Sequence, residues 1–336
     1  MRPSRSDAES VLDPPILPMA AEARATLPPA GEPGSLVWQQ KLDGYRVVVF
    51  VRAGRLYLQS RTGADLTGHF PELQEAAAAV GEDLVLDGEL VVLRDGRLDF
   101  AALQQRARLT GYRARSAGRS SPAHVVLFDV LEADGRELLG RPYRERWDRL
   151  ERLFAAGTLA GRWVLVGSTL DRGQALEWMD PAWGRVGVEG VVAKPAGAPY
   201  RPGRRGWIKV RSRQTTEGVV GAVTGPVAAP DTLLLGRRDA EGALRMVART
   251  TPLSAAARRE VGALLTAAGP EHPWSGVRFS AAWGSRAALR HTPVEPLLVA
   301  EVEADSSVSD EGRQRHPVTF VRLRDDMAPD AVPPVG

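Results

Sequence analysis

Lysine occupies only three positions of this sequence, and its scarcity marks residues that could carry chemistry. The 336-residue chain has 44 lysines and arginines, of which only Lys41, Lys194 and Lys209 are lysine. A strong arginine bias often reflects the base composition of a genome, which explains the arginines but not the three exceptions. A lysine ammonium can lose its proton and become a nucleophile, whereas a guanidinium in practice stays protonated. The three lysines are therefore candidates for chemistry that arginine cannot perform.

Each lysine lies in a short motif, and four further motifs accompany these three along the chain. Taken alone, "KLDG" predicts a β-turn with an exposed lysine, and "LFDVL" predicts a buried strand with a core phenylalanine. The glutamates of "LDGE" and "EGVVAK", taken alone, predict solvated turn carboxylates. Specificity comes from the ordered set. That set comprises "KLDG" (41–44), "SRTG" (60–63), "LDGE" (86–89), "LFDVL" (127–131), "EGVVAK" (189–194), "WIKVR" (207–211) and "RHPVTFVRLRDDM" (315–327).

With these seven motifs in this order, the sequence resembles the ATP-dependent DNA ligases. That family belongs to the covalent nucleotidyltransferases, which also include RNA ligases and mRNA capping enzymes. The similarity extends from Pro14 to Met327, and it includes the small bacterial stand-alone ligases and the ligase module of the bacterial end-joining enzyme. It implies an enzyme of DNA repair that seals nicks between a 3′-hydroxyl and a 5′-phosphate through a lysine–AMP intermediate.

The resemblance assigns the residues that contact ATP. Lys41 matches the lysine that becomes adenylated. Its attack on the α-phosphorus needs an unprotonated amine, so burial and neighbouring positive charge must lower a pKa that is near ~10.4 in a free lysine. Arg46 matches the arginine that follows this lysine, and Arg61 matches a phosphate-contacting arginine. Phe128 matches the aromatic that stacks on adenine, and Gln39 stands where the family often has a glutamate that contacts the base.

The remaining assigned residues are carboxylates and cations. Glu89 matches an acid near the ribose and the metal, and Glu189 matches a metal-binding carboxylate. The resemblance therefore implies Mg²⁺ or Mn²⁺, since hard cations neutralise the charge that phosphoryl transfer develops. Lys194 and Lys209 match cations that hold the phosphates. For Lys194 an alternative is equally open, in which it supports the residues that contact the nucleotide and does not contact the phosphates itself.

Two motifs depart from the family at their ends. Arg211 replaces the second lysine usual in the "WIKVR" motif, which keeps the charge and changes the geometry. The last motif ends in Arg324-Asp325-Asp326-Met327, where the family usually has a final lysine. Arg324 matches a residue presented to the leaving pyrophosphate. In the family that final lysine orients the pyrophosphate, and Met327 stands in its place here.

The elements that must position these residues fall into two regions. Residues 15–213 alternate buried strands with short helices, which indicates an α+β fold. The resemblance identifies this region as the nucleotidyltransferase (ATP-grasp-like ligase adenylation) domain of antiparallel sheets and helices. Residues 214–327 hold five or six short strands and one helix, a pattern that suits a C-terminal OB-fold β-barrel. Residues 1–14 and 328–336 are predicted to be a disordered lead-in and tail.

The composition indicates in which cellular compartment the protein acts and what kind of partner it binds. The chain has no cysteine, which excludes disulfides and thiolate metal sites and fits a reducing cytoplasm. No apolar run approaches the ~18–20 residues that span a membrane. Residues 1–213 hold 31 basic and 26 acidic side chains, whereas residues 214–336 hold 13 and 15. This mild positive bias of the larger region suits an anionic partner. We expect a cytoplasmic, nucleoid-associated monomer that binds nicked duplex DNA and is recruited by repair or end-joining proteins.

Two other interpretations of the motifs stay open. An ATP-dependent RNA ligase or a capping guanylyltransferase shares the lysine motif, and the nucleotide that labels the protein, ATP or GTP, would separate capping from ligation. A nucleic-acid-binding protein with an inactive site is the alternative from a different class. That alternative predicts a broken motif, yet Lys41, Glu89 and Glu189 are all present.

Overall fold

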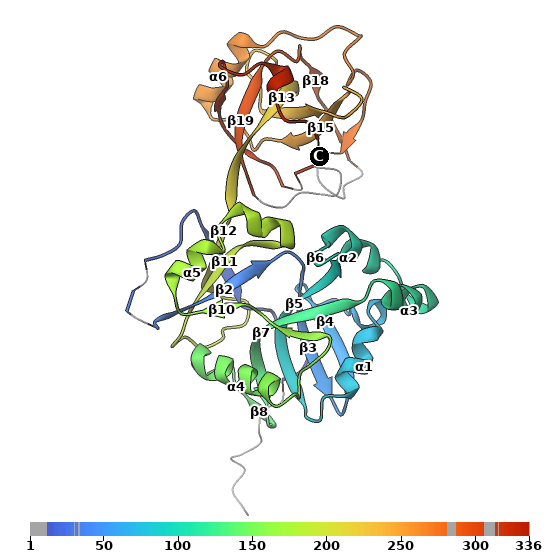
Figure 1. Ribbon diagram of the computed structural model, residues 1–336, viewed down its shortest axis with the longest axis vertical. Coiled ribbons are helices and arrows are strands. Elements are labelled where there is room, and N and C mark those ends of the chain that lie inside the picture. The colour runs from blue at the N-terminus through green and yellow to red at the C-terminus, as the bar shows by residue number, and fades with distance from the viewer. Residues whose placement is uncertain are drawn as a thin grey trace, which may run out of the picture. The chain divides into compact units, whose positions relative to one another are not determined.

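The chain folds into two units, Met1–Ser212 and Arg213–Gly336, in the computed structural model (Figure 1). The structure describes residues 12–29, 31–32, 34–280, 287–305, 313–314 and 316–335. Across these residues, no helix is long and apolar enough to cross a membrane. The division after Ser212 falls where the sequence changes from mixed strands and helices to short strands.

A seven-stranded sheet is the largest element of the first unit. Its strands are β3 (Tyr45–Arg52), β4 (Arg55–Ser60), β5 (Leu84–Arg94), β6 (Arg97–Leu98), β7 (Ala123–Ala133), β8 (Arg136–Glu137) and β9 (Trp163–Leu165). The order is β4-β3-β5-β7-β8, with β6 antiparallel to β5 and β9 parallel to β7. All five residues from Val47 to Val51 are buried, because β-branched and aromatic side chains fit a strand that is covered on both faces.

A second sheet of five strands carries the three lysines. It consists of β1 (Ala20–Arg24), β2 (Leu36–Leu42), β10 (Ser168–Thr169), β11 (Val188–Pro195) and β12 (Arg205–Arg211), in the order β1-β12-β11-β2-β10. Lys41 lies opposite Gly190 across β2 and β11, and Lys209 lies opposite Val192 across β12 and β11. Lys194 is itself on β11. Residues far apart in the sequence thus come from three adjacent strands.

Short helices accompany these sheets. They are η1 (Thr67–His69), α1 (Glu72–Ala78), α2 (Phe100–Arg106), α3 (Gly111–Ser120), α4 (Tyr143–Ala155), α5 (Arg172–Glu177) and η2 (Pro181–Val186). Asp99, Asp171 and Asp180 precede α2, α5 and η2, and each accepts a hydrogen bond from a first-turn N–H group. Helix α4 packs on β7 through the apolar face that contains Leu150 and Leu153.

The second unit is rich in strands. Its sheet consists of β13 (Arg213–Thr224), β14 (Thr232–Arg238), β15 (Leu244–Arg249), β18 (Thr292–Pro293), β19 (Val299–Asp305) and β20 (Thr319–Leu323). The order is β15-β14-β13-β19-β20, and β18 pairs with β13. A parallel bridge joins Thr250, directly after β15, to Val318, directly before β20. This unit also contains helix α6 (Ala255–Leu264) and the antiparallel pair of β16 (Phe279–Ser280) with β17 (Ala288–Leu289).

The described chain ends differ from the predicted disordered segments. Residues 329–331 form the 3₁₀ helix η3 (Pro329–Ala331), Val332 is buried in an apolar cluster, and the N–H of Val335 donates to the carbonyl of Arg238. At the other end, the N–H of Leu12 donates to Glu132. Apolar burial and backbone hydrogen bonds hold these residues, which a polar, proline-rich composition did not reveal. Residues 1–11 of the predicted lead-in lie outside the described residues.

Candidate active site

A cavity of about 430 Å³ in the first unit collects most of the predicted site residues. Its walls come from both sheets of that unit and from the segment that leads into β1. Gly203, in the loop between β11 and β12, lies at the same cavity. Eight predicted residues line it: Gln39, Lys41, Arg46, Arg61, Glu89, Phe128, Lys194 and Lys209.

Glu189 and Arg211 do not line the cavity but adjoin Lys41. The Lys41 ammonium donates a hydrogen bond to Oε2 of Glu189. The Nε of Arg211 lies 3.9 Å from the same oxygen, and the Glu189 side chain is only 5% exposed. Gly190 allows β11 and β12 to lie this close together. Its backbone has a φ of 141°, and a Cβ there would lie 2.1 Å from the carbonyl oxygen of Val210. A nearly buried carboxylate therefore lies beside the Lys41 ammonium.

Glu89 also lies near Lys41, whose charge acts on it. It is opposite Arg46 across β3 and β5, and the close approach of Gly44 to the Glu89 side chain brings "KLDG" against "LDGE". Removal from bulk water raises the pKa of Glu89 to about 7, although Lys41 and Arg46 act in the opposite direction. Near neutral pH, Glu89 can therefore carry or release a proton, and a bound cation would favour its ionised form.

Arg46 does not extend a free guanidinium into the cavity. It forms a bidentate ion pair with Asp87, at 2.9 Å from Nε to Oδ1 and 2.6 Å from Nη2 to Oδ2. The hydroxyl of Tyr200 donates to the same Oδ2 at 2.7 Å. The guanidinium lies 4.9 Å from the centre of the Trp207 ring. Sequence reasoning missed Asp87, Tyr200 and Trp207 as partners, although Asp87 and Trp207 are inside quoted motifs.

Lys194 is enclosed by aromatic rings. Its Nζ lies 4.0 Å from the ring centre of Trp207 and 4.4 Å from that of Phe128, and it donates to the carbonyl of Phe128 at 3.0 Å. Burial lowers the pKa of Lys194 to about 7, while Asp129 and Asp87 act to raise it. The side chain is fully buried. Its contacts therefore fit a role in supporting neighbouring site residues better than direct binding of phosphate.

Lys209 and Arg61 supply positive charge at the cavity. Burial lowers the pKa of Lys209, and the nearby charges of Lys41, Arg211 and Arg61 lower it further. Three cations are thus close enough to Lys209 to act on its charge. Clustered cations of this kind repel one another and destabilise the protein unless an anion neutralises them. A triphosphate is an anion that suits such a cavity.

Gln39 leaves one polar atom of the cavity unused. Its Nε2 donates to the hydroxyl of Tyr143 at 2.7 Å. Its Oε1 is buried and accepts no hydrogen bond from any residue that the structure describes. An orphaned buried acceptor is destabilising, so a donor on a bound molecule would relieve it. The amino group of adenine has that donor character, and ATP therefore fits this end of the cavity.

The carboxylates fit a divalent cation that is shared with a nucleotide. Within the described ranges, no group of three or more His, Cys, Asp or Glu could hold a metal ion. Mg²⁺ commonly takes one or two carboxylates and completes its shell with water and substrate phosphates. Glu89 and Glu189, both near Lys41, supply two hard oxygen donors of the required kind.

Arg324 belongs to the second unit and is paired there. Its Nε and Nη2 donate to the two carboxylate oxygens of Asp326 at 2.8 and 2.9 Å, and its Nη1 donates to Glu217 at 3.0 Å. The residue directly follows β20. Of the predicted site residues, it is the one that lies outside the first unit.

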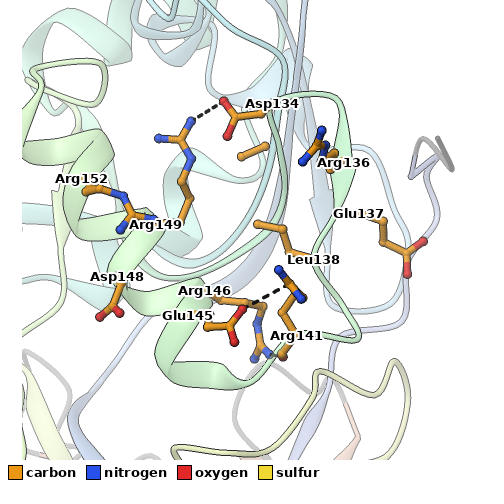
Figure 2. Close-up of a pocket in the computed structure, with 11 residues that line it drawn as sticks. Asp134, Arg136, Glu137, Leu138, Arg141, Glu145, Arg146, Asp148, Arg149 and Arg152 are labelled. Atoms are coloured by element: carbon orange, nitrogen blue, oxygen red, sulfur yellow. Dashed lines mark hydrogen bonds and ion pairs between the residues drawn. The ribbon is translucent and has the colours of Figure 1, made fainter. Parts of the chain in front are cut away.

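A second cavity of the first unit has a different chemistry (Figure 2). It measures about 420 Å³, and arginines and acids alternate around it. Arg149 pairs with Asp134 at 2.9 Å, and Arg141 pairs with Glu145 at 3.2 Å, as the dashed lines in Figure 2 show. None of the predicted site residues lines it. Its charges are largely neutralised within the protein, so we regard it as a surface hollow outside the catalytic region.

Known proteins share this arrangement of sequence and fold. Residues 18–211 match the family model of the ATP dependent DNA ligase domain. DNA ligase C1 of Mycolicibacterium smegmatis is 34% identical over 95% of this chain and 93% of its own length. The solved structure of mycobacterial DNA ligase D complexed with ATP and MES is 32% identical, covers 95% of this chain and 98% of its own, and superimposes with a TM-score of 0.51. The multifunctional non-homologous end joining protein LigD of M. smegmatis is 35% identical over 88% of this chain and 37% of its own length.

The family model covers more than half of the chain, and the relatives exceed 30% identity over almost all of it. The cavity adds a lysine beside a carboxylate, with further cations around it. These observations agree with one another, and the chain belongs to the ATP-dependent DNA ligase family.

Proposed function

We propose that this ATP-dependent DNA ligase seals nicks through a covalent AMP on Lys41. The observation that carries the proposal is the contact of Lys41 with the buried Glu189 at a cation-lined cavity. In the first step, Nζ of Lys41 forms a bond to the α-phosphorus of ATP, and the bond to the pyrophosphate oxygen breaks. A 5′-phosphate oxygen of the nick then displaces the lysine and takes the AMP. Finally the 3′-hydroxyl attacks that phosphate, the nick closes and AMP leaves.

The residues around Lys41 have separable roles in this scheme. Glu189 accepts the lysine proton, because its carboxylate is the hydrogen-bond partner of Nζ. Lys209, Arg61 and Arg211 neutralise the phosphates, and Arg46 keeps the wall of the cavity in place through Asp87. Phe128 contributes an apolar surface for the base, and Lys194 holds Phe128 through its carbonyl.

A divalent cation, Mg²⁺ or Mn²⁺, completes the proposed site. Glu89 and Glu189 would hold it together with the phosphates of ATP. Such an ion supplies charge neutralisation at the triphosphate. The carboxylates themselves keep the lysine hydrogen-bonded and hold negative charge near the ribose end of the nucleotide.

For the second unit we propose an OB-fold barrel. The sheet order β15-β14-β13-β19-β20, together with the Thr250–Val318 bridge between its outer ends, supports a closed five-stranded barrel. Its Arg324 would act on the leaving pyrophosphate after release from Asp326 and Glu217. This unit would then change position between adenylation and nick sealing.

End joining or another repair pathway is the proposed setting, since one similar protein is named for non-homologous end joining. We propose that the ligase acts there as a monomer, recruited by other repair proteins to nicked duplex DNA. Excision repair remains compatible with the same chemistry.

Substrate preference gives the direct test of this function. We expect purified protein with labelled ATP and Mg²⁺ to form a covalent adenylate, and then to seal a nicked DNA duplex faster than nicked RNA or a hybrid. The reason is that the family relatives are named as DNA ligases. Adenylation followed by sealing of RNA alone would favour the RNA-ligase alternative. Absence of any covalent nucleotide would contradict the proposal.

DNA binding is expected to depend on the arginine loop between β11 and β12. Arg201 and Arg204 in this loop and Arg205, the first residue of β12, are exposed, and no ion pair joins them to a described residue. Gly203, within this loop, lines the nucleotide cavity. Replacing all three arginines by alanine should weaken binding to a nicked duplex. The slope of log Kd against log salt should fall by about one for each DNA phosphate that the protein no longer neutralises.

The matched control replaces three arginines that line the hollow in Figure 2: Arg136, Arg141 and Arg152. These lie among Glu137, Glu145 and Asp148, so they should contribute little to phosphate binding. Equal slopes in the loop variant and the wild type would exclude the loop. The next surface to test would then be α3, where Arg113, Arg115 and Arg119 are exposed and no acidic residue is present.

A further inference from the structure

Gln39 poses a problem of base recognition that a glutamate would not. Both oxygens of a carboxylate accept hydrogen bonds, whereas an amide has one accepting end and one donating end. A glutamine beside a purine can therefore favour the 6-amino group of adenine or the 6-carbonyl of guanine, depending on which end faces the base. Something in the protein must fix its orientation if the enzyme is to distinguish ATP from GTP.

The hydroxyl of Tyr143 fixes this orientation. It lies 3.1 Å from the carbonyl oxygen of Phe128, which has no proton to give, so the single hydroxyl proton is donated there. Toward Gln39, 2.7 Å away, the hydroxyl can then act only as an acceptor. The NH₂ end of Gln39 must face Tyr143, which leaves Oε1 as the end without a protein partner among the described residues.

The surroundings hold Tyr143 rigidly and keep it protonated. It is the first residue of α4, it is buried, and its N–H donates to the carbonyl of Ala198 at 2.9 Å. The guanidinium of Arg146 lies 5.4 Å from its ring centre. Burial raises the pKa of Tyr143 well above its ordinary value, an effect that Asp129 reinforces and Arg146 opposes. The phenol therefore keeps its proton throughout the working pH range.

The free oxygen of Gln39 lies in a residue that lines the cavity, and the side chain is only 1% exposed. An adenine 6-amino group would satisfy this acceptor. A guanine 6-carbonyl would bring a second acceptor against it, and the buried Oε1 would still lack a hydrogen bond. The acceptor thus discriminates between the two purines through both attraction and repulsion.

We propose that Tyr143 is a positioning residue that makes this ligase select ATP over GTP, by locking the amide of Gln39 with its acceptor toward the base. The proposal rests on the function proposed above, because it concerns the nucleotide that Lys41 takes up. It assigns a role in specificity to a side chain at the start of a helix, 102 positions after Lys41 in the sequence.

The test compares covalent labelling of Lys41 by ATP and by GTP in the full-length protein. In Tyr143→Phe, the amide of Gln39 loses the acceptor that held its NH₂ end and can turn over. We expect kcat/KM for ATP to fall and that for GTP to rise, so that the ATP-to-GTP ratio drops by about tenfold, the effect of one misplaced hydrogen bond. An unchanged ratio in a variant that still adenylates would overturn the proposal.

A rescue experiment separates orientation from general damage. In the Gln39→Glu, Tyr143→Phe double variant, both ends of residue 39 accept hydrogen bonds, so the preference for ATP should return. A ratio as low in the double variant as in Tyr143→Phe would contradict the locking role. Tyr112→Phe, at a tyrosine that is 72% exposed, removes a hydroxyl from the surface and should leave the ratio at its wild-type value.

A second measurement needs no variant. The wild-type enzyme is given the ATP analogue that lacks the 6-amino group, and its kcat/KM should be about tenfold below that for ATP. Equal values would show that Oε1 of Gln39 does not bind this group. They would contradict the inference even if Tyr143→Phe failed to fold. Failure of the wild type to take up any nucleotide would instead refute the proposed function itself.

Discussion

Lys41→Arg should abolish formation of the covalent adenylate. The substitution keeps the positive charge and nearly the same length, but a guanidinium does not release its proton to become a nucleophile at any working pH. The expected loss in adenylation rate is at least about a thousandfold, as for removal of other catalytic nucleophiles. Radiolabelled ATP followed by denaturing electrophoresis measures the covalent product directly. Label retained by Lys41→Arg would mean that another residue is the nucleophile.

Lys209→Arg is the matched comparison for this result. The same change of side chain at a proposed phosphate contact keeps a cation that can still bind the anion, so we expect reduced but measurable adenylation. Equal loss in both variants would imply that the cavity does not tolerate arginine at either position. The difference between the two variants therefore isolates the chemistry of the nucleophile from the charge of the site.

Most residues predicted for the site meet at one cavity because most of the motifs lie on strands of one unit. Lys41 and Glu189 are 148 positions apart, yet β2 and β11 are adjacent and the two side chains are hydrogen-bonded. The buried strands predicted for residues 15–213 include β3, β5 and β7, whose β-branched residues are buried. Backbone pairing between strands thus brings these predicted residues together.

The contacts that the sequence did not reveal involve side chains from several segments at once. The environment of Lys194 depends on rings from β7, α4 and β12, and no local pattern specifies their meeting. Helix α3 escaped prediction because its glycines and arginines form no apolar stripe, and only Ala114 and Gly118 are buried. Arg324 fits a motif, but its pairing with Asp326 became visible only in the structure.

The buried ion pair of Asp129 and Arg146 should have the largest effect on stability. Both side chains are 0% exposed, and the guanidinium donates to the two carboxylate oxygens at 2.8 and 2.9 Å. Arg146→Met leaves the Asp129 carboxylate buried without its cation, which should lower the free energy of unfolding by about 3–5 kcal/mol. Urea unfolding followed by tryptophan fluorescence and far-ultraviolet circular dichroism measures this change.

Arg149→Met, three positions further along the same helix, is the control for this prediction. Arg149 pairs with Glu82 and Asp134, but its side chain is 19% exposed and that of Asp134 is 66% exposed, so water can replace much of the interaction. Its loss should cost only about 1 kcal/mol. The double variant Asp129→Leu, Arg146→Met removes both charges and should be more stable than Arg146→Met alone, because no unpaired carboxylate remains buried. If the double variant were the less stable of the two, an unpaired buried carboxylate would not account for the loss in Arg146→Met.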